Sequence, residues 1–298
     1  MKILYSIILC HFFLGIQSQE LRRIVVIDSI SRLPIPFVAI QTSDNEGIYS
    51  DESGQFYINK VNIDSIISFK TIGYKNLILT KQNLTDSIFL SPKVEVLQEI
   101  DIGVTFKQEE IGLHNKPTNF TWNIEPKREF ITSLTFDRRF IKSHLEKVHV
   151  PIKKISGLNN TDIKAALRIN IYTSCTQNNL LDKFFESQPV YCDSNLKGRL
   201  IFDISDAVIE INKECIYIGL EFLGFINEKG EIQQNMKGTL SVPFTKKKTK
   251  EFSSNTYIKP MFSENDEWIP INNIIEKYTN LNGDYSLPIG LTISSRED

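Results

Sequence analysis

Residues 215–222 read CIYIGLEF, a stretch in which every second side chain is apolar. The apolar row consists of Ile216, Ile218, Leu220 and Phe222. Glu221 lies on the opposite face. Alternation with a period of two is how a β-strand buries one face and exposes the other to water. The stretch therefore predicts a strand of an antiparallel sheet, with Glu221 in solvent.

The same alternation recurs through the second half of the chain. In residues 167–173, LRINIYT, the apolar row is Leu167, Ile169 and Ile171. The opposite row of that stretch is Arg168, Asn170 and Tyr172. Residues 199–205, RLIFDIS, alternate in the same way. Residues 118–298 are therefore predicted to form a large β-sandwich, with one short helical turn near residues 273–278.

The first third of the chain also indicates strands. From residue 21 to residue 104, short apolar runs are separated by turns such as DNEG at 44–47 and DESG at 51–54. Turn signals every 8–12 residues or so are typical of an all-β sandwich. Residues 19–106 are therefore predicted to form a first sandwich, joined to the second by a linker at 107–117.

Composition excludes several classes of protein. The 298 residues carry a net charge of −2, and 41% of them are hydrophobic. A nucleic-acid-binding protein usually has a clear basic excess, and a disordered chain has fewer apolar residues. We expect a folded protein that does not bind nucleic acid.

Residues 1–18, MKILYSIILCHFFLGIQS, have the layout of a secretory signal peptide: a basic start, a short apolar run and a small residue at the cut. Cleavage after Ser18 would leave Gln19 first. A retained anchor is disfavoured because the apolar run is shorter than the ~20 residues that span a bilayer. Lipidation at Cys10 is a second alternative, disfavoured because Leu9 stands where a small residue is expected. The mature chain is predicted to be exported, periplasmic or surface-associated, without a transmembrane segment.

Five short motifs in residues 22–103 resemble the carboxypeptidase-regulatory-like, or peptidase-associated, domain of exported proteins from Bacteroidetes-type bacteria. The motifs are VVID at 25–28, LPIPFV at 33–38, SDESGQF at 50–56, IGYK at 72–75 and LQEI at 97–100. The resemblance implies a transthyretin-like, seven-stranded β-sandwich and no peptidase chemistry in the domain itself. The second half is similar, more weakly, to the jelly-roll-like sandwich that follows this domain in many such proteins.

Cysteine spacing leaves a disulfide open. The mature chain would keep Cys175, Cys192 and Cys215, an odd number. A bridge between Cys175 and Cys192 is one interpretation, because both lie near predicted strand ends. Three buried thiols are the other, since free cysteine is among the most buried residue types.

Searches for catalytic and metal-binding motifs find none. His144 and His149 are five residues apart, whereas a helical zinc motif needs a spacing of four, so both are expected to flank a strand in solvent. The acidic residues of the turns at 44–47 and 51–54 do not have the spacing of a calcium loop. Asp203 and Asp206 are assigned to a turn or cap. We predict no catalytic, metal or cofactor site, and that the chain is not an enzyme.

Aromatic residues offer a candidate binding surface for a sugar or a peptide. The candidates are Trp122, Tyr172, Tyr191, Tyr257, Trp268 and Tyr285. The surface is assigned chiefly to Trp122, Tyr257 and Trp268, with core packing as the alternative for each.

The expected function is that of a non-catalytic, exported cell-envelope protein acting as a binding, scaffolding or regulatory accessory module. Its partner would be an envelope protein, a peptide or a glycan. Two alternatives remain: a carbohydrate- or peptide-binding module of an envelope uptake system, and a hydrolase with carboxylates at strand ends.

Overall fold

The structure is a computed structural model. It describes residues 21–43, 45–59, 66–93, 106–112, 120–157, 162–173, 182–196, 198–211, 215–233, 236–246, 248–263, 268–281 and 283–296. The predicted signal peptide, the LQEI motif at 97–100 and Cys175 lie outside these residues. The predicted all-β fold is confirmed, since strands dominate both parts of the described chain.

The N-terminal unit, residues 21–93, contains seven strands in its described part. They are β1 (Leu21–Asp28), β2 (Ala39–Ser43), β3 (Glu46–Tyr49), β4 (Gln55–Asn59), β5 (Ile66–Lys70), β6 (Leu77–Thr80) and β7 (Ser87–Leu90). A short 3-10 helix, η2 (Lys81–Asn83), precedes β7.

These seven strands form two packed sheets, in the orders β4-β1-β7 and β3-β2-β5-β6. The inward residues of each strand alternate, so Ile24 and Val26 of β1 are buried while their neighbours are less so. Phe56 of β4 meets Phe69 of β5 across the sandwich, with ring centroids 6.1 Å apart. The period-two pattern of the sequence therefore places one core between two sheets.

The turn before β4 is held by local hydrogen bonds and by a glycine, as its sequence predicts. Asp51 Oδ1 accepts hydrogen bonds from the backbone amides of Ser53 (2.9 Å) and Gln55 (2.8 Å). Gly54 has a φ of +69°, and a Cβ there would meet Val26 O at 2.9 Å. Only glycine combines that backbone conformation with that close approach.

The C-terminal unit, residues 106–296, contains the remaining elements. Its strands are β8 (Phe106–Gly112), β9 (Phe120–Ile124), β10 (Arg128–Phe136), β11 (His144–Ile152), β12 (Lys154–Ser156), β13 (Lys164–Thr173), β14 (Asp182–Glu186), β15 (Val190–Cys192), β16 (Gly198–Asp203), β17 (Ile209–Glu210), β18 (Cys215–Ile226), β19 (Thr239–Phe244), β20 (Phe252–Pro260), β21 (Ile269–Pro270) and β22 (Gly290–Arg296). Its helices are the 3-10 turns η3 (Arg138–Phe140) and η4 (Ser205–Ala207), and α2 (Ile271–Tyr278). The predicted helical turn lies within α2.

Two large sheets of this unit face each other. One has the order β14-β13-β18-β10-β20-β21, with β15 also paired to β13. The other has the order β16-β11-β22-β8, with β17 also paired to β11. A small sheet, β12-β19-β9, closes one end, where Phe244 of β19 packs edge-on against Phe130 of β10. The apolar rows predicted from β13 and β18 lie in this core.

Residues 107–112, placed in the linker by the sequence, belong to β8. This strand pairs with β22 in an antiparallel register from Gly112↔Gly290 to Phe106↔Arg296. A strand at the edge of a sheet can be rich in charged residues, as KQEE at 107–110 is. Such a strand lacks the alternation of apolar and polar residues by which the other strands were predicted.

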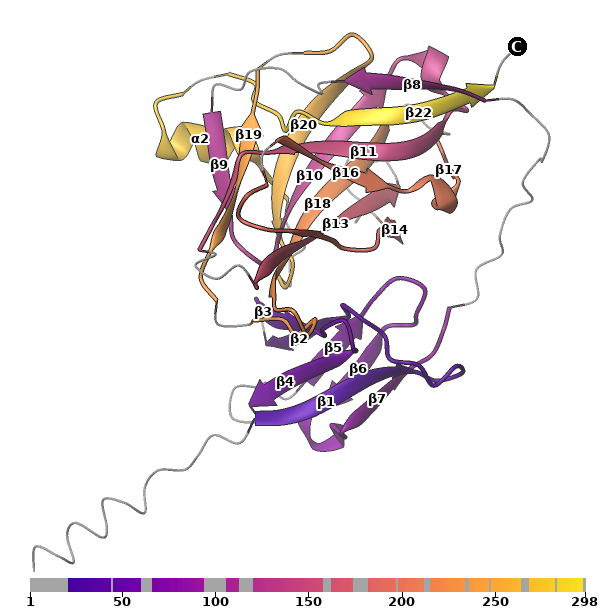
Figure 1. Cartoon of the computed structure of the whole chain (residues 1–298), viewed down its shortest axis with the longest axis vertical. Coiled ribbons are helices and arrows are strands. Elements are labelled where there is room, and N and C mark those ends of the chain that lie inside the picture. The colour runs from indigo at the N-terminus through magenta and orange to yellow at the C-terminus, as the bar shows by residue number, and fades with distance from the viewer. Residues whose placement is uncertain are drawn as a thin grey trace, which may run out of the picture.

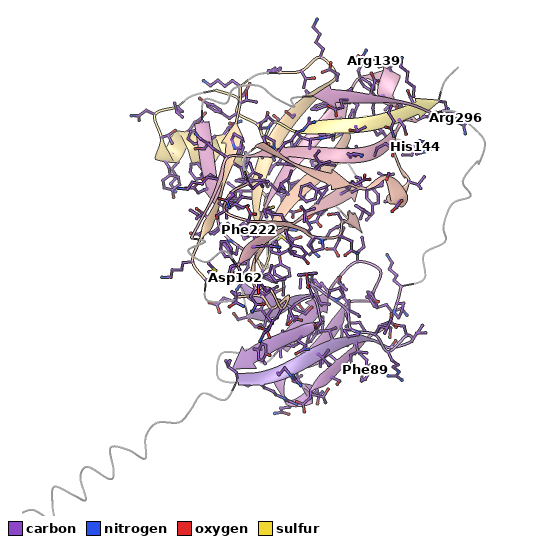
Figure 2. All side chains as sticks on the ribbon, viewed as in Figure 1. Phe89, Arg139, His144, Asp162, Phe222 and Arg296 are labelled. Carbon is purple, nitrogen blue, oxygen red and sulfur yellow. The ribbon has the colours of Figure 1, made fainter. Side chains whose placement is uncertain are left out.

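The N-terminal unit lies against the outer face of the sheet that contains β13 and β18, with β2 and β3 on the side nearest that sheet (Figure 1). Side chains fill the space between Phe222 and the N-terminal unit (Figure 2). A separate apolar cluster joins the two units: Phe37 and Tyr49 pack with Ala166, Leu223 and Phe262. The face predicted to be wet is therefore covered by protein.

Candidate functional site

A cluster of charged side chains lies buried on the outer face of the seven-stranded sheet. Arg168 of β13 stands opposite Glu221 of β18, and Glu221 stands opposite Glu129 of β10. Both glutamates are fully buried, and Arg168 is 4% exposed. The prediction that this row faces water is wrong, because the N-terminal unit covers it.

Arg168 is the central cation of this cluster. Its Nε donates to Glu221 Oε2 at 2.6 Å and its Nη2 to Glu221 Oε1 at 3.2 Å. The same Nη2 lies 3.0 Å from Glu186 Oε2. Burial by itself would raise the pKa of Glu221, but the Arg168 guanidinium outweighs it and lowers that pKa to about 2. Burial would also raise the pKa of Glu186, but the cations Arg168 and Lys183 outweigh it, so this pKa is lowered as well.

Glu129 is the third buried carboxylate and behaves differently. Asn170 Nδ2 donates to Glu129 Oε1 and to Glu221 Oε2, each at 2.7 Å, and Tyr172 Oη donates to Glu129 Oε2 at 2.6 Å. Burial, followed by the charge of Glu221, raises the pKa of Glu129. Gly219 leaves the space that this carboxylate occupies, since a Cβ there would collide with Glu129 Oε1.

The N-terminal unit is hydrogen-bonded to this cluster. Tyr49 Oη donates to Glu221 Oε1 at 2.5 Å. The backbone amide of Ile72 donates to Glu186 Oε1 at 3.0 Å. Buried hydrogen bonds to charged groups are stronger than neutral ones, so these contacts hold the two units in one arrangement.

A cleft of about 680 Å³ opens beside the cluster, between the two units. Its described lining comes from the N-terminal unit (Ala39, Gln41, Ser68, Lys70, Thr71, Ile72, Asn76) and from the C-terminal unit (Tyr172, Lys183, Lys259, Met261, Phe262, Ser263). The charged side chains among these are three lysines. Lys183 Nζ lies 2.6 Å from Glu186 Oε2, which links the cleft directly to the buried cluster.

An aromatic group lies next to the cleft residue Tyr172. The ring of Trp268 is 5.7 Å from Tyr172, 5.5 Å from Tyr217 and 6.0 Å from Tyr257, centroid to centroid. These rings meet at interplanar angles of 53° to 71°, so they do not form a flat platform. The structure thus brings together Tyr257 and Trp268.

The third residue of the predicted aromatic surface lies elsewhere. Trp122 is on β9, contacts Phe120 at 5.9 Å and packs against the core of the C-terminal unit. Trp122 therefore serves core packing, which is the alternative reading that the sequence left open.

The histidines were expected to flank a strand in solvent, and this expectation is wrong. Both lie within β11, and His149 is 2% exposed. His149 Nε2 lies 2.8 Å from Thr292 Oγ1 on the neighbouring strand. Within the described part of the chain, no three His, Cys, Asp or Glu side chains gather to hold a metal ion.

Two cysteines lie in the described residues. Cys192 is buried, and burial raises the pKa of its thiol to about 12, so as a thiol it does not ionise at neutral pH. Cys215 is half-buried, and its thiol donates to the backbone oxygen of Ile216 at 3.9 Å. Because Cys175 lies outside the described residues, its pairing with Cys192 stays a prediction.

Sequence reasoning missed the buried cluster, although a signal for it exists. Arg168 and Glu221 occupy the polar rows of two strands that both have a strong apolar row, and opposite charges facing each other across strands stabilise a pair. What the sequence does not show is that these strands are neighbours, or that another unit covers them.

Comparisons with known proteins give only remote matches. No known family profile and no curated protein matches the chain. The solved structure of the cysteine protease and lectin-like domains of Cwp84, a surface-layer-associated protein of Clostridium difficile, matches with a TM-score of 0.38 and 9% identity, over 87% of this chain and 58% of that chain. The clostridial cysteine protease Cwp84 after propeptide cleavage matches with a TM-score of 0.38 and 10% identity, over 87% and 65%. The chain thus spans less than two thirds of the length of either.

These matches correct one prediction. Both solved chains are described as a cysteine protease or as containing one, which contradicts the expectation that this chain is not an enzyme, and that expectation is withdrawn. At a TM-score of 0.38 the likeness assigns no activity, ligand or partner to this chain. Among the described helices, none has the length and apolar character needed to cross a bilayer.

Proposed function

We propose that the protein is an exported ligand-binding protein whose ligand occupies the cleft between its two units. The cleft of about 680 Å³, with walls from both units, is the observation that carries this proposal. Small-molecule sites usually fall in the range of about 300–1,000 Å³ and occur preferentially at domain interfaces.

The buried cluster supports a binding role because it fixes the walls of the cleft. Tyr49 and the Ile72 amide tie the N-terminal unit to the glutamates of the C-terminal unit, and Lys183 belongs to both the cluster and the cleft. A site whose walls are held in advance loses less conformational freedom when a ligand binds. The cluster is thus assigned to positioning.

Export and the domain type belong to the proposal. The N-terminal unit is proposed to be a carboxypeptidase-regulatory-like domain, on the motifs at 25–28, 33–38, 50–56 and 72–75 and on its seven strands in two sheets. Sequencing of the mature N-terminus tests export: Gln19 should come first, and a retained Met1 would contradict it.

A cleft-filling variant tests the site. In the full chain, Ser68→Phe places a ring in the cleft, and Ser91→Phe adds the same ring at an exposed position of the same unit. Both are compared with the unchanged chain on glycan and peptide arrays. Ligands retained by the unchanged chain and by Ser91→Phe, but lost by Ser68→Phe, support the cleft. Binding that survives Ser68→Phe places the ligand elsewhere and refutes the proposal.

A further inference from the structure

Glu129 differs from the other carboxyl groups of the buried cluster in its hydrogen-bond donors. Both cations that form ion pairs within the cluster contact Glu186 or Glu221. In the described residues, Glu129 accepts hydrogen bonds from the amide of Asn170 and the hydroxyl of Tyr172, and both donors are neutral. The side chain of Glu129 is fully buried. A carboxyl group that is cut off from water and whose donors are neutral is costly to ionise.

Charged and titratable groups face Glu129 from several strands. Glu221 stands opposite it on β18, and Lys259 stands opposite it on β20. The other described groups around it are Tyr49 of β3, Arg168 and Tyr172 of β13, and Lys183 and Glu186 of β14. The charges of Lys183 and Lys259 favour the ionised form of Glu129. Burial and the negative charge of Glu221 outweigh them, so the pKa of Glu129 is raised.

On this geometry we propose that Glu129 is a neutral carboxylic acid in the assembled protein, and that its proton stabilises the contact between the two units. A hydroxyl group can accept as well as donate, so neutral Glu129 donates its proton to Tyr172 Oη along the 2.6 Å contact. Glu221, which accepts from Tyr49 of the N-terminal unit, then has no second negative charge beside it. When the units separate, water reaches Glu129, and the proton is released to the solvent.

This proton makes the contact depend on pH in a defined direction. In the separated state Glu129 is hydrated, so its pKa returns toward the ordinary value of 4.5. Above that pH each separation releases one proton, and the equilibrium constant for separation rises ~10-fold per pH unit until the raised pKa is reached. Glu186 and Glu221, whose pKa values are lowered, are ionised in both states above pH 6 and add no such slope. Because the walls of the cleft come from both units, the same proton governs whether these walls stand together.

Amide hydrogen exchange of the full chain, resolved by residue between pH 6 and pH 7, tests the inference. The backbone amides of Ile72 and Glu52 donate to acceptors in the C-terminal unit. Their protection, corrected for the intrinsic effect of pH on exchange, should fall ~10-fold over this pH unit. The amide of Val26 donates to an acceptor within its own unit and should stay better protected at both pH values. Equal protection of all three amides would assign the exchange to unfolding of the whole chain and overturn the inference.

Variants assign the effect to Glu129. Glu129→Gln carries a neutral side chain at every pH, so it should remove the slope at Ile72 and Glu52. It should also remove the carboxylic-acid C=O band from the infrared spectrum at pH 7. Glu276→Gln, at an exposed position of α2, should keep both. The slope in the unchanged chain needs no variant, so it tests the inference even if Glu129→Gln fails to fold. A missing slope in the unchanged chain, a slope that persists in Glu129→Gln, or an infrared band that is the same in all three chains would each overturn it.

Discussion

Replacing Arg168 by methionine tests the claim that the cluster is a buried ionic network. Arg168 contacts two carboxylates, and the side chains of Arg168, Glu186 and Glu221 are all at most 6% exposed. Arg168→Met keeps most of the side-chain volume and leaves these carboxylates without their main cation. Breaking a buried pair in this way costs about 3–5 kcal/mol of the free energy of unfolding.

The pKa of Glu221 gives a second route to the same magnitude. Its reduction from 4.5 to about 2 corresponds to about 3 kcal/mol of preferential stabilisation of the ionised form. This contribution is fully present above pH 4.5 and is lost as the pH falls toward 2. In Arg168→Met the main cause of the lowering is gone, and burial raises the pKa of Glu221 instead. The variant should therefore recover more stability between pH 7 and pH 5 than the unchanged chain, in which only Glu129 among these three carboxylates has a raised pKa.

Urea denaturation measures both effects, followed by tryptophan fluorescence and by circular dichroism at pH 7 and pH 5. Arg199→Met is the matched control, because Arg199 is 3.5 Å from Glu110 at a partly exposed position. Its loss should stay below about 1 kcal/mol. A loss below about 1 kcal/mol for Arg168→Met, or a deficit that is the same at both pH values, would refute the buried network.

Three further predictions concern the same cluster. Tyr49→Phe removes the hydrogen bond to Glu221, so it should lower the free energy of unfolding by about 1.5–3 kcal/mol and speed hydrogen exchange in β2 and β3. Tyr278→Phe, at an exposed position, should change neither. Equal exchange in the two variants would contradict this prediction. Glu129→Gln should be at least as stable as the unchanged chain in thermal melts at pH 8. The reason is that the pKa of Glu129 is raised, so its ionisation costs stability above pH 4.5. A lower Tm of the variant at pH 8 would refute this. Gly219→Ala should lower the free energy of unfolding by about 1–3 kcal/mol, because the added methyl group overpacks against Glu129. In a Glu129→Ala background this loss, measured in urea, should largely vanish. A loss that persists there would assign the effect to the backbone.

Period-two patterning was enough to find the core. The apolar rows of β13 and β18 point inward as predicted, because only the side-chain alternation of a strand decides which residues share a face. The turn at residues 51–54 was also predicted correctly, since Asp51 and Gly54 act through local backbone geometry.

The burial of the opposite row could not be predicted in this way. Arg168, Asn170 and Glu221 have the same polarity whether water or another unit covers them, and the covering residues Tyr49 and Ile72 lie about 100 or more positions away in the chain. The cleft was out of reach for the same reason, since its walls come from both units. Strand β8 was missed because the polar run KQEE at 107–110 occupies its middle.

Because the N-terminal unit covers one face of the seven-stranded sheet, separating the two units would expose that face. A fragment that starts at residue 106 would expose the side chains of Arg168, Glu129, Glu186 and Glu221 to water. The rings of Tyr172 and Phe262 would lose cover as well. A fragment that stops at residue 93 would carry Tyr49 and Phe37 bare on its surface. Either half expressed alone would thus be prone to aggregate, and neither half contains the complete cleft.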